Sequence, residues 1–199
     1  MVIVPIGFNF YFDSEMKDRV EEYTIHFTGK GSEDFTFYFG STNKTYQLWS
    51  ATNKIQIWPE SNLQKWTPNR EVRRDFIVEP PTPNGYYYRC MQSGKTGQTE
   101  PVWPSTGEVN NDNSVIWKCL GKKIRPEDVK MALERSSLKD VGGGAKLDIG
   151  AEIKGGESIP IYFRVTNTDS TIRSDLFHPC ISIKINDVIL TYPLSKEEE

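Results

Sequence analysis

Short runs in which apolar and polar residues alternate recur along this chain, and they constrain its fold more than any other feature. The clearest are residues 159–165 (IPIYFRV) and 181–185 (ISIKI). An alternation of period two places one set of side chains on each face of a β-strand. Clusters of glycine, proline and asparagine separate the runs, as is typical of turns. The pattern predicts an all-β protein with at most one short helix.

The first third of the chain carries the same signal. Residues 34–39 (DFTFYF) combine aromatic and β-branched types, which favours a half-buried strand. Residues 46–49 and 54–58 follow at short spacing, which indicates a hairpin or a meander, with Ile55 and Ile57 on one face. His26 lies in an alternating stretch as well, and a strand histidine is the simplest interpretation.

Residues 126–133 are consistent with two structures. Pro126 suits the first position of a helix, and the two acidic residues after it would favour the helix dipole. Val129, Met131 and Leu133 fit strand alternation equally well. Periodicity does not decide between them, and the strand is favoured because clear strands follow.

Composition limits the core and the classes of partner. Hydrophobic residues make up 37% of the 199 residues, and nine of these are tyrosines. The core is therefore modest, divided among small modules, or completed by another subunit. No apolar run approaches the ~20 residues of a membrane-spanning helix, and residues 1–15 lack a secretory signal pattern. A net charge of -3 argues against nucleic acid as the main ligand.

The inventory of reactive residues predicts no cofactor and no metal site. The three cysteines are odd in number and widely spaced, and only two histidines occur. No phosphate-binding glycine loop is present. A catalytic role would need two carboxylates facing each other about 5–10 Å apart. Glu100 and Asp112 are candidates, but nothing in the sequence pairs them, so an enzyme is not expected and a glycan hydrolase is the enzymatic alternative.

The most distinctive segment is residues 84–121, NGYYYRCMQSGKTGQTEPVWPSTGEVNNDNSVIWKCLG. It resembles a small β-module that recurs in bacteriophage structural and tail-fibre proteins and is often described as carbohydrate-binding-like. With the lead-in Trp66-Thr67-Pro68 and the strand 76–78, the resemblance covers residues 66–121. The family usually has Asp-Gly-Thr-Val before the last strand, where this chain has Asp112-Asn113-Ser114-Val115.

The aromatic residues of this module are the candidate site. Alternation places Tyr86 and Tyr88 on one strand face with Cys90, and Pro101 and Pro104 hold Trp103 in an extended segment. Trp103 either fills a miniature core or forms a platform for sugar rings. The core is favoured. The candidate glycan-binding or interface aromatics are Trp103, Trp117, Tyr86, Tyr88 and Trp66.

A second resemblance covers residues 122–194. The run LDIGAEIKGGESIPIYFRV looks like the mid-domain hairpin of immunoglobulin-like sandwich domains, and phage virion proteins have a similar run with a strand like residues 160–164. The expected domains are an N-terminal β region over 1–65, which could pack with the C-terminal sandwich, the carbohydrate-binding-like module over 66–121, and an immunoglobulin-like sandwich over 122–199.

Together the two resemblances imply a virion structural protein of a bacteriophage tail, at the baseplate or tail tip, made in the host cytoplasm. The implied partners are other tail proteins in an oligomeric assembly, with bacterial surface polysaccharide as a further candidate. Trp49, Trp58 and the strip Phe8–Phe12 are candidates for subunit contacts. A host-glycan receptor-binding protein and a neck, collar or head decoration protein are the alternatives.

Overall fold

The computed structural model describes residues 7–169 and 181–191, and these are almost entirely β-structure. The predicted all-β class is confirmed. Within these ranges the helices are two short 3₁₀ segments, η1 (Pro126–Asp128) and η2 (Arg135–Lys139), where at most one was expected. Pro126 opens η1, and a strand begins directly after this helical turn at Val129. Residues 126–133 therefore contain both expected structures, a short helical turn followed by a strand.

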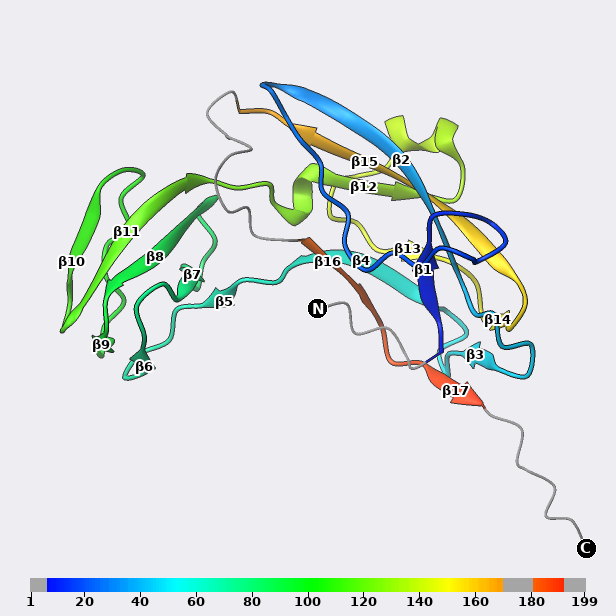
Figure 1. The fold of residues 1–199 in the computed structure, drawn as a ribbon, viewed down its shortest axis with the longest axis horizontal. Coiled ribbons are helices and arrows are strands. Elements are labelled where there is room, and N and C mark those ends of the chain that lie inside the picture. The colour runs from blue at the N-terminus through cyan, green and yellow to red at the C-terminus, as the bar shows by residue number, and fades with distance from the viewer. Residues whose placement is uncertain (1–6, 170–180, 192–199) are drawn as a thin grey trace, which may run out of the picture.

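The first layer of the larger unit is a four-stranded antiparallel sheet in the order β1-β2-β15-β12 (Figure 1). Its strands are β1 (Asn9–Tyr11), β2 (Gly31–Gly40), β15 (Ser158–Asn167) and β12 (Val129–Ala132). Strands β2 and β15 pair over ten residues each, from Gly31 opposite Asn167 to Gly40 opposite Ser158. Segments far apart in sequence therefore form the centre of this sheet.

The second layer consists of two three-stranded sheets placed end to end. One has the order β13-β4-β16, and the other has the order β14-β3-β17. Their strands are β13 (Leu147–Asp148), β4 (Gln56–Ser61), β16 (Ile181–Ile185), β14 (Glu152–Lys154), β3 (Gln47–Trp49) and β17 (Ile189–Thr191). Strands β3 and β4 do not pair with each other, so the hairpin or meander expected over residues 46–58 is wrong.

Asn186 bridges the break between these two sheets. Its Oδ1 accepts a hydrogen bond from the Gln56 amide at 2.7 Å, and its Nδ2 donates to the Lys54 carbonyl at 2.8 Å. An amide side chain thus supplies the donor and the acceptor that a regular ladder would have provided here.

The connection from β14 to β15 crosses from one layer to the other. A hairpin was expected across residues 155–158, and the structure corrects this because β14 pairs with β3 whereas β15 pairs with β2. Ile153 on β14 and Ile161 on β15 are both buried in the core between the layers. In a hairpin, β14 and β15 would pair with each other and lie in one sheet, whereas here each belongs to a different layer.

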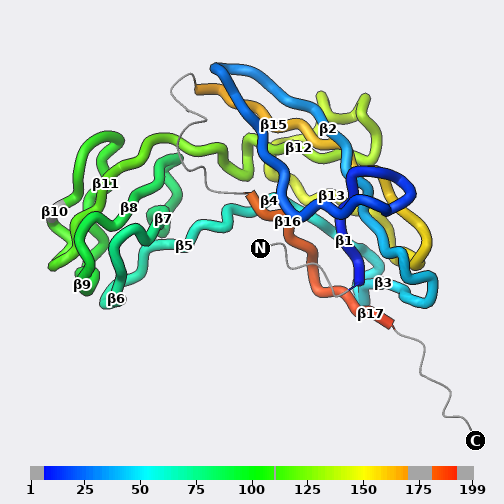
Figure 2. The backbone as a smooth tube through the Cα atoms, in the orientation of Figure 1, coloured from blue at the N-terminus to red at the C-terminus, as the bar shows by residue number. Residues whose placement is uncertain are grey.

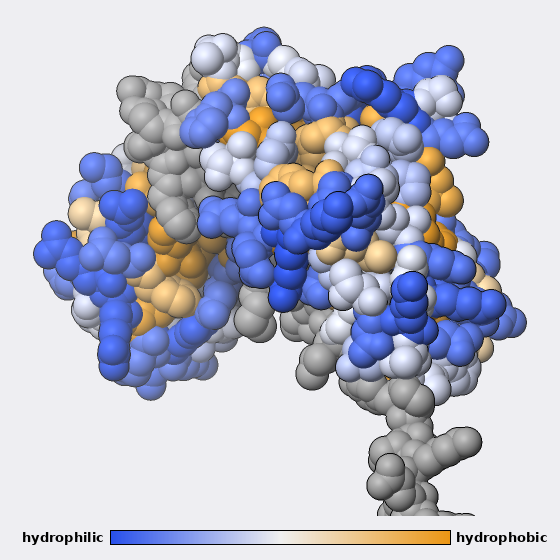
Figure 3. Space-filling view, turned by 45° about the vertical axis from the view of Figure 1, so that its right-hand side comes forward, coloured by the Kyte–Doolittle hydropathy of each residue, from blue (hydrophilic) through white to orange (hydrophobic). Residues whose placement is uncertain are grey.

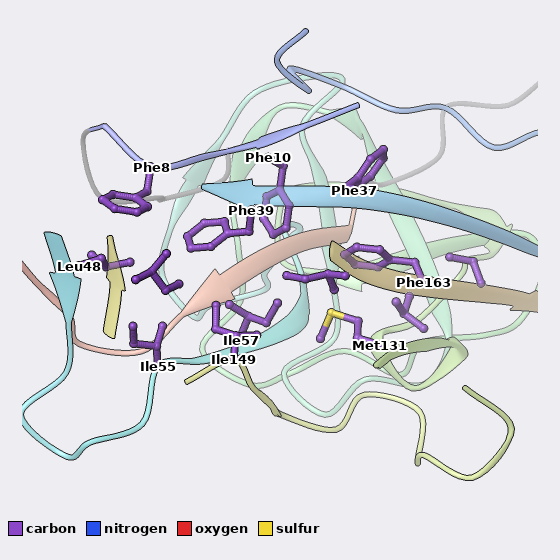
Figure 4. Close-up of a cluster of buried hydrophobic side chains, with 14 residues drawn as sticks. Phe8, Phe10, Phe37, Phe39, Leu48, Ile55, Ile57, Met131, Ile149 and Phe163 are labelled. Atoms are coloured by element: carbon purple, nitrogen blue, oxygen red, sulfur yellow. The ribbon is translucent and has the colours of Figure 1, made fainter. Parts of the chain in front are cut away.

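The main hydrophobic core lies between the two layers (Figure 4). Its aromatic part comes from β1 and the residue before it, β2 and β15, and its aliphatic part comes from both layers. The buried members are Phe8, Phe10, Phe37, Phe39, Leu48, Ile55, Ile57, Val129, Met131, Ile149, Ile153, Ile161, Phe163 and Val165. Phe8 and Phe10 are therefore core residues and not the subunit contacts expected of the strip Phe8–Phe12, in which Phe12 alone is markedly exposed.

The chain between β1 and β2 covers one end of this core. Val20, Ile25 and Phe27 pack against it as an irregular segment, so the strand expected around His26 is not formed. The burial still alternates, with Ile25 and Phe27 half-buried and His26 exposed. The alternation in the sequence reports this burial correctly, although no neighbouring strand pairs with the segment in the structure.

A second, smaller unit is inserted between β4 and β12 and lies to one side of the sandwich (Figure 2). A five-stranded sheet in the order β10-β11-β8-β7-β5 and a two-stranded ribbon, β6-β9, build it. Its strands are β5 (Gln64–Lys65), β6 (Glu71–Val72), β7 (Ile77–Glu79), β8 (Tyr86–Gln92), β9 (Gly94–Lys95), β10 (Glu108–Asp112) and β11 (Val115–Lys122).

The N-terminal and C-terminal segments share both layers of the sandwich. Strand β2 pairs with β15, and β4 pairs with β13 and β16. The strands that the structure describes within residues 122–199 therefore build the two layers together with β1 to β4. Their inward faces are buried only because β1 to β4 complete the two layers, a closer association than the packing of two regions that the sequence suggested.

Candidate functional site

The five aromatic residues selected from the sequence come together in one cluster of the inserted unit. Tyr86 and Tyr88 lie on β8, and Trp117 lies on the neighbouring strand β11. Trp66 follows β5, and Trp103 lies in the loop before β10. The cluster also contains Val72, Val78, Cys90, Val109 and Val115, with Phe76 and Cys119 at its margin.

Three of the five are interior residues. Trp117 and Tyr88 have no exposed surface, and Trp66 is 5% exposed. A ring enclosed on both faces has no surface for a sugar, so these three are corrected from candidate contact residues to core residues. Tyr86 and Trp103 are half-buried and keep one accessible side. A unit of this size needs large aromatic side chains to build a core at all.

Asp112 organises the buried part of the cluster, and sequence reasoning missed this role. Its Oδ2 accepts hydrogen bonds from the indole Nε1 of Trp66 at 2.9 Å and from that of Trp117 at 2.6 Å. Its Oδ1 accepts from the Gly97 amide at 2.6 Å. The residue has no exposed surface. A buried carboxylate is tolerated when such donors replace its water.

The only sequence signal for this arrangement is an aspartate near the end of a β-hairpin among several tryptophans.

The same geometry bears on the enzymatic alternative. Asp112 is enclosed by its three donors, and Glu100 accepts from the Trp103 indole at 2.9 Å. For Asp112 to reach a substrate, the core of the unit would have to open.

Trp103 lies over the buried rings as the outermost member of the cluster. Its ring centre is 4.5 Å from that of Tyr88, with an interplanar angle of 47°, and 5.9 Å from that of Trp117. Such tilted arrangements are favourable for aromatic pairs. The neighbouring Val102 is 78% exposed. The loop therefore presents part of the Trp103 indole and the Val102 side chain at the surface.

Tyr88 fixes this loop to the sheet. Its hydroxyl donates to the Pro104 carbonyl at 2.9 Å and accepts from the Asn84 side-chain amide at 3.1 Å. Burial raises the pKa of the Tyr88 phenol, so the hydroxyl keeps the proton that it donates. The position of Trp103 is thus set by a hydrogen bond beside it as well as by the two prolines.

The two cysteines of the unit lie on paired strands but not opposite each other. Cys90 is opposite Trp117, and Cys119 is opposite Tyr88. Both are free thiols, and burial raises the pKa of each. A protonated thiol is a poor nucleophile and metal ligand. Cys180, like His178, lies outside the described residues.

No family model, curated protein or solved structure matches this chain. Within residues 7–169 and 181–191, no group of three or more histidine, cysteine, aspartate or glutamate residues could hold a metal ion. In the same ranges, no helix has the length and apolar character required to span a membrane.

The sandwich has its own exposed aromatic residues. Trp49 is 37% exposed on β3, and Phe12 and Tyr23 are 41% and 43% exposed. Trp58 is half-buried, and the Lys146 ammonium lies 4.6 Å from its ring centre. Figure 3 shows hydrophilic residues over most of one face of the molecule, with hydrophobic residues confined to smaller patches. Apart from Phe8, Phe10 and Tyr11, the aromatic residues expected at subunit contacts are at least partly accessible.

Proposed function

We propose that this protein is a structural component of a bacteriophage tail, at the baseplate or tail tip, and that it acts by assembly with other tail proteins. The observation that carries the proposal is the inserted unit. The residues that resemble the phage module fall within one continuous, folded unit whose core is built from them. This correspondence between residues 66–121 and one folded unit is the support for the proposal.

The way the unit is attached also suits a role in assembly. It leaves the sandwich at β4 and returns before β12, so both of its chain ends are tied to one scaffold. Lys123 forms an ion pair with Glu79 at this junction, and its Nζ donates to the Ser61 hydroxyl at 3.0 Å. These buried contacts restrain the unit relative to the sandwich, as a rigid connector requires.

The sheet edges supply surfaces for neighbouring subunits. Strand β12 is an outer strand of the first layer, whereas the outer side of β1 already pairs with residues 18–20. Among the described strands, β10 and β5 are the outer strands of the inserted sheet. The free backbone groups of an outer strand can pair with a strand of another chain. Exposed Phe12 and Tyr23 lie near the β1 edge and add apolar area there.

A second candidate function is adhesion to host surface glycan, and the geometry of Trp103 favours it. The indole is accessible on one side, it is held at the surface by a fixed loop, and a carboxylate accompanies it. Aromatic faces pair with the C–H groups of sugar rings, and carboxylates accept hydrogen bonds from hydroxyl groups. This function would use the same fold with a different partner.

Labelling of intact particles tests the proposed location. Phage particles are prepared from the cells that encode this chain and incubated with a gold-labelled antibody against it. We expect labels at the distal end of the tail. Recovery of the chain solely in the particle-free fraction would contradict the assembly role, whereas label at the neck, collar or head would support the decoration alternative.

A further inference from the structure

A hollow of about 400 Å³ lies on the sandwich where β3, the turn that follows it and the start of β14 meet. Figure 1 places these two strands at the end of the sandwich away from the inserted unit. The hollow is open to solvent, so a ligand would lie on it with one side exposed. Its lining residues are Gln47, Trp49, Ser50, Asn53, Ala151 and Glu152. Apart from Trp49 and Ala151, these residues are polar, so the lining suits a ligand rich in hydroxyl groups more than an apolar protein surface.

Trp49 is directed to the outside by strand alternation. Leu48 has no exposed surface and points into the core, so its neighbours Gln47 and Trp49 point outward. The Trp49 indole Nε1 donates to the Thr191 hydroxyl on β17 at 3.1 Å. This hydrogen bond fixes the ring orientation before any ligand arrives, which reduces the entropy lost on binding.

The residues opposite Trp49 differ on its two sides. Glu152 on β14 lies opposite it on one side, and Ile189 on β17 lies opposite it on the other. Ile189 is 45% exposed and extends the apolar area beside the ring. Glu152 contributes a carboxylate to the hollow. The ring therefore has an apolar border on one side and a polar border on the other.

The polar border is held in place as well. The Gln47 side-chain amide donates to Oε2 of Glu152 at 2.9 Å, and the Lys154 ammonium lies 3.8 Å from Oε1. A carboxylate has about four lone-pair positions, so Glu152 keeps acceptor capacity for ligand hydroxyl groups. Beyond it, the turn at Ser50 is closed by the Asn53 amide, which donates to the Ser50 carbonyl at 2.9 Å.

We propose that this hollow is a saccharide-binding site. A pyranose ring would lie with its C–H face on the Trp49 indole, because the negative face of the ring system attracts the positive C–H groups. Glu152 and Gln47 would hydrogen-bond to the equatorial hydroxyl groups. The site goes beyond the assembly function, does not depend on it, and is separate from Trp103.

Indole resonances offer a direct test, since the chain has five tryptophans and each indole N–H gives one signal. The full chain labelled with ¹⁵N is titrated separately with glucose, galactose, mannose, rhamnose and N-acetylglucosamine. The Trp49 signal is identified by its loss in Trp49→Phe. We expect at least one sugar to shift it in a saturable manner, with a Kd of about millimolar order, as is typical of a small weakly held ligand.

Variants separate binding by this hollow from other causes. We expect Trp49→Ala to abolish the saturable shifts of the remaining signals and Glu152→Gln to weaken binding by about tenfold, the equivalent of one charged hydrogen bond. Trp58→Phe is the matched control, because Trp58 also lies in the second layer but its ring is covered by Lys146. Unchanged dispersion of the other indole signals shows that each variant is folded.

Two results would overturn the proposal. One is a Trp49 signal that none of the five sugars shifts in a saturable manner. The other is sugar binding that survives in Trp49→Ala, or that shifts the Trp103 signal and leaves Trp49 unmoved. The second result would assign the sugar site to the inserted unit and leave the assembly proposal unaffected.

Discussion

Asp112 connects three parts of the inserted unit through a single buried side chain. Trp66, Trp117 and the Gly97 amide come from different segments, and all three donate to its carboxylate. Hydrogen bonds to a charged acceptor are stronger than those between neutral groups, and an unmatched buried donor is costly. The two indoles are therefore held by polar contacts as well as by packing.

Replacing Asp112 by asparagine should destabilise the protein. One oxygen becomes an amide NH₂ group, which would face an N–H donor where it now meets an acceptor, and the negative charge is lost. We expect a loss of about 2–4 kcal/mol in the free energy of unfolding, measured by urea denaturation with tryptophan fluorescence. Asp187→Asn, at an exposed position, is the control and should change little. Equal stability of both variants would contradict the role given to Asp112.

Replacement of Trp103 tests whether its ring stabilises the core or serves as an exposed binding surface. Because its ring is half-buried on Tyr88 and Trp117, Trp103→Ala should cost about 2 kcal/mol, less than the roughly 3–5 kcal/mol for a fully buried aromatic. Thermal unfolding measures this change. An unchanged melting temperature together with lost binding on a glycan array would instead make Trp103 a sugar platform.

The ion pair of Asp34 should make the free energy of unfolding fall at acid pH. The Arg164 guanidinium contacts it through two hydrogen bonds of 2.7 and 2.8 Å, and this lowers the pKa of Asp34 below its usual 3.8. A lowered folded-state pKa contributes stability that is present above the unfolded pKa and lost as pH falls through the folded value.

Comparison with Asp34→Asn isolates this contribution. The difference in unfolding free energy between the natural chain and the variant should be constant above about pH 5 and should shrink progressively below about pH 4. Denaturant unfolding at a series of pH values measures it. A difference that stays the same down to about pH 2 would rule out the ion pair as its source.

At the scale of elements, the passage from β14 to β15 determines that the chain forms two layers. Gly155 lies where this passage meets the turn before β3, and its amide donates to the Tyr46 carbonyl at 2.7 Å. A Cβ atom at Gly155 would lie 1.8 Å from the Asn43 carbonyl oxygen. The close approach of the two backbones therefore requires glycine.

Gly155→Ala should consequently destabilise the sandwich. The backbone would have to shift to admit the methyl group, and we expect a cost of about 1–3 kcal/mol, typical of overpacking. Gly142→Ala is the matched control, because a Cβ there has no described atom within 4 Å. Equal urea midpoints for the two variants would show that the crossing tolerates a side chain.

At the scale of the whole molecule, the buried pair Glu79–Lys123 joins the inserted unit to the sandwich. The two side chains are 4% and 2% exposed. The Ser61 hydroxyl, at the end of β4, lies 3.4 Å from the Glu79 carboxylate. The segments that leave and re-enter the sandwich therefore meet at this one cluster of polar side chains, which is buried between the sandwich and the inserted unit.

Removing one partner leaves the other charge buried and uncompensated. We expect Lys123→Met to cost about 3–5 kcal/mol, and the double variant Lys123→Met with Glu79→Leu to recover part of that loss. Urea denaturation and limited proteolysis between residues 61 and 79 measure the two effects. A double variant that is no more stable than Lys123→Met alone would contradict the expectation that an unpaired buried charge causes the loss.

The sequence by itself determined the class of fold, most of the strands, and the residues that build the inserted unit. Period-two alternation is a local property, so Ile55 with Ile57, and Tyr86 with Tyr88, could be assigned to shared faces. The same information could not decide which strands pair. The hairpins expected over 46–58 and 147–165 are absent because pairing depends on segments more than a hundred residues away.

Only the tertiary structure decided which aromatic residues are accessible. Phe8, Phe10, Trp66 and Trp117 have the same side-chain chemistry as Trp49 and Trp103, and nothing local distinguishes them. Their burial follows from the opposite layer that covers each face. The hollow at Trp49 likewise requires β3 and β14 side by side, an arrangement that exists only after two segments about a hundred residues apart have met.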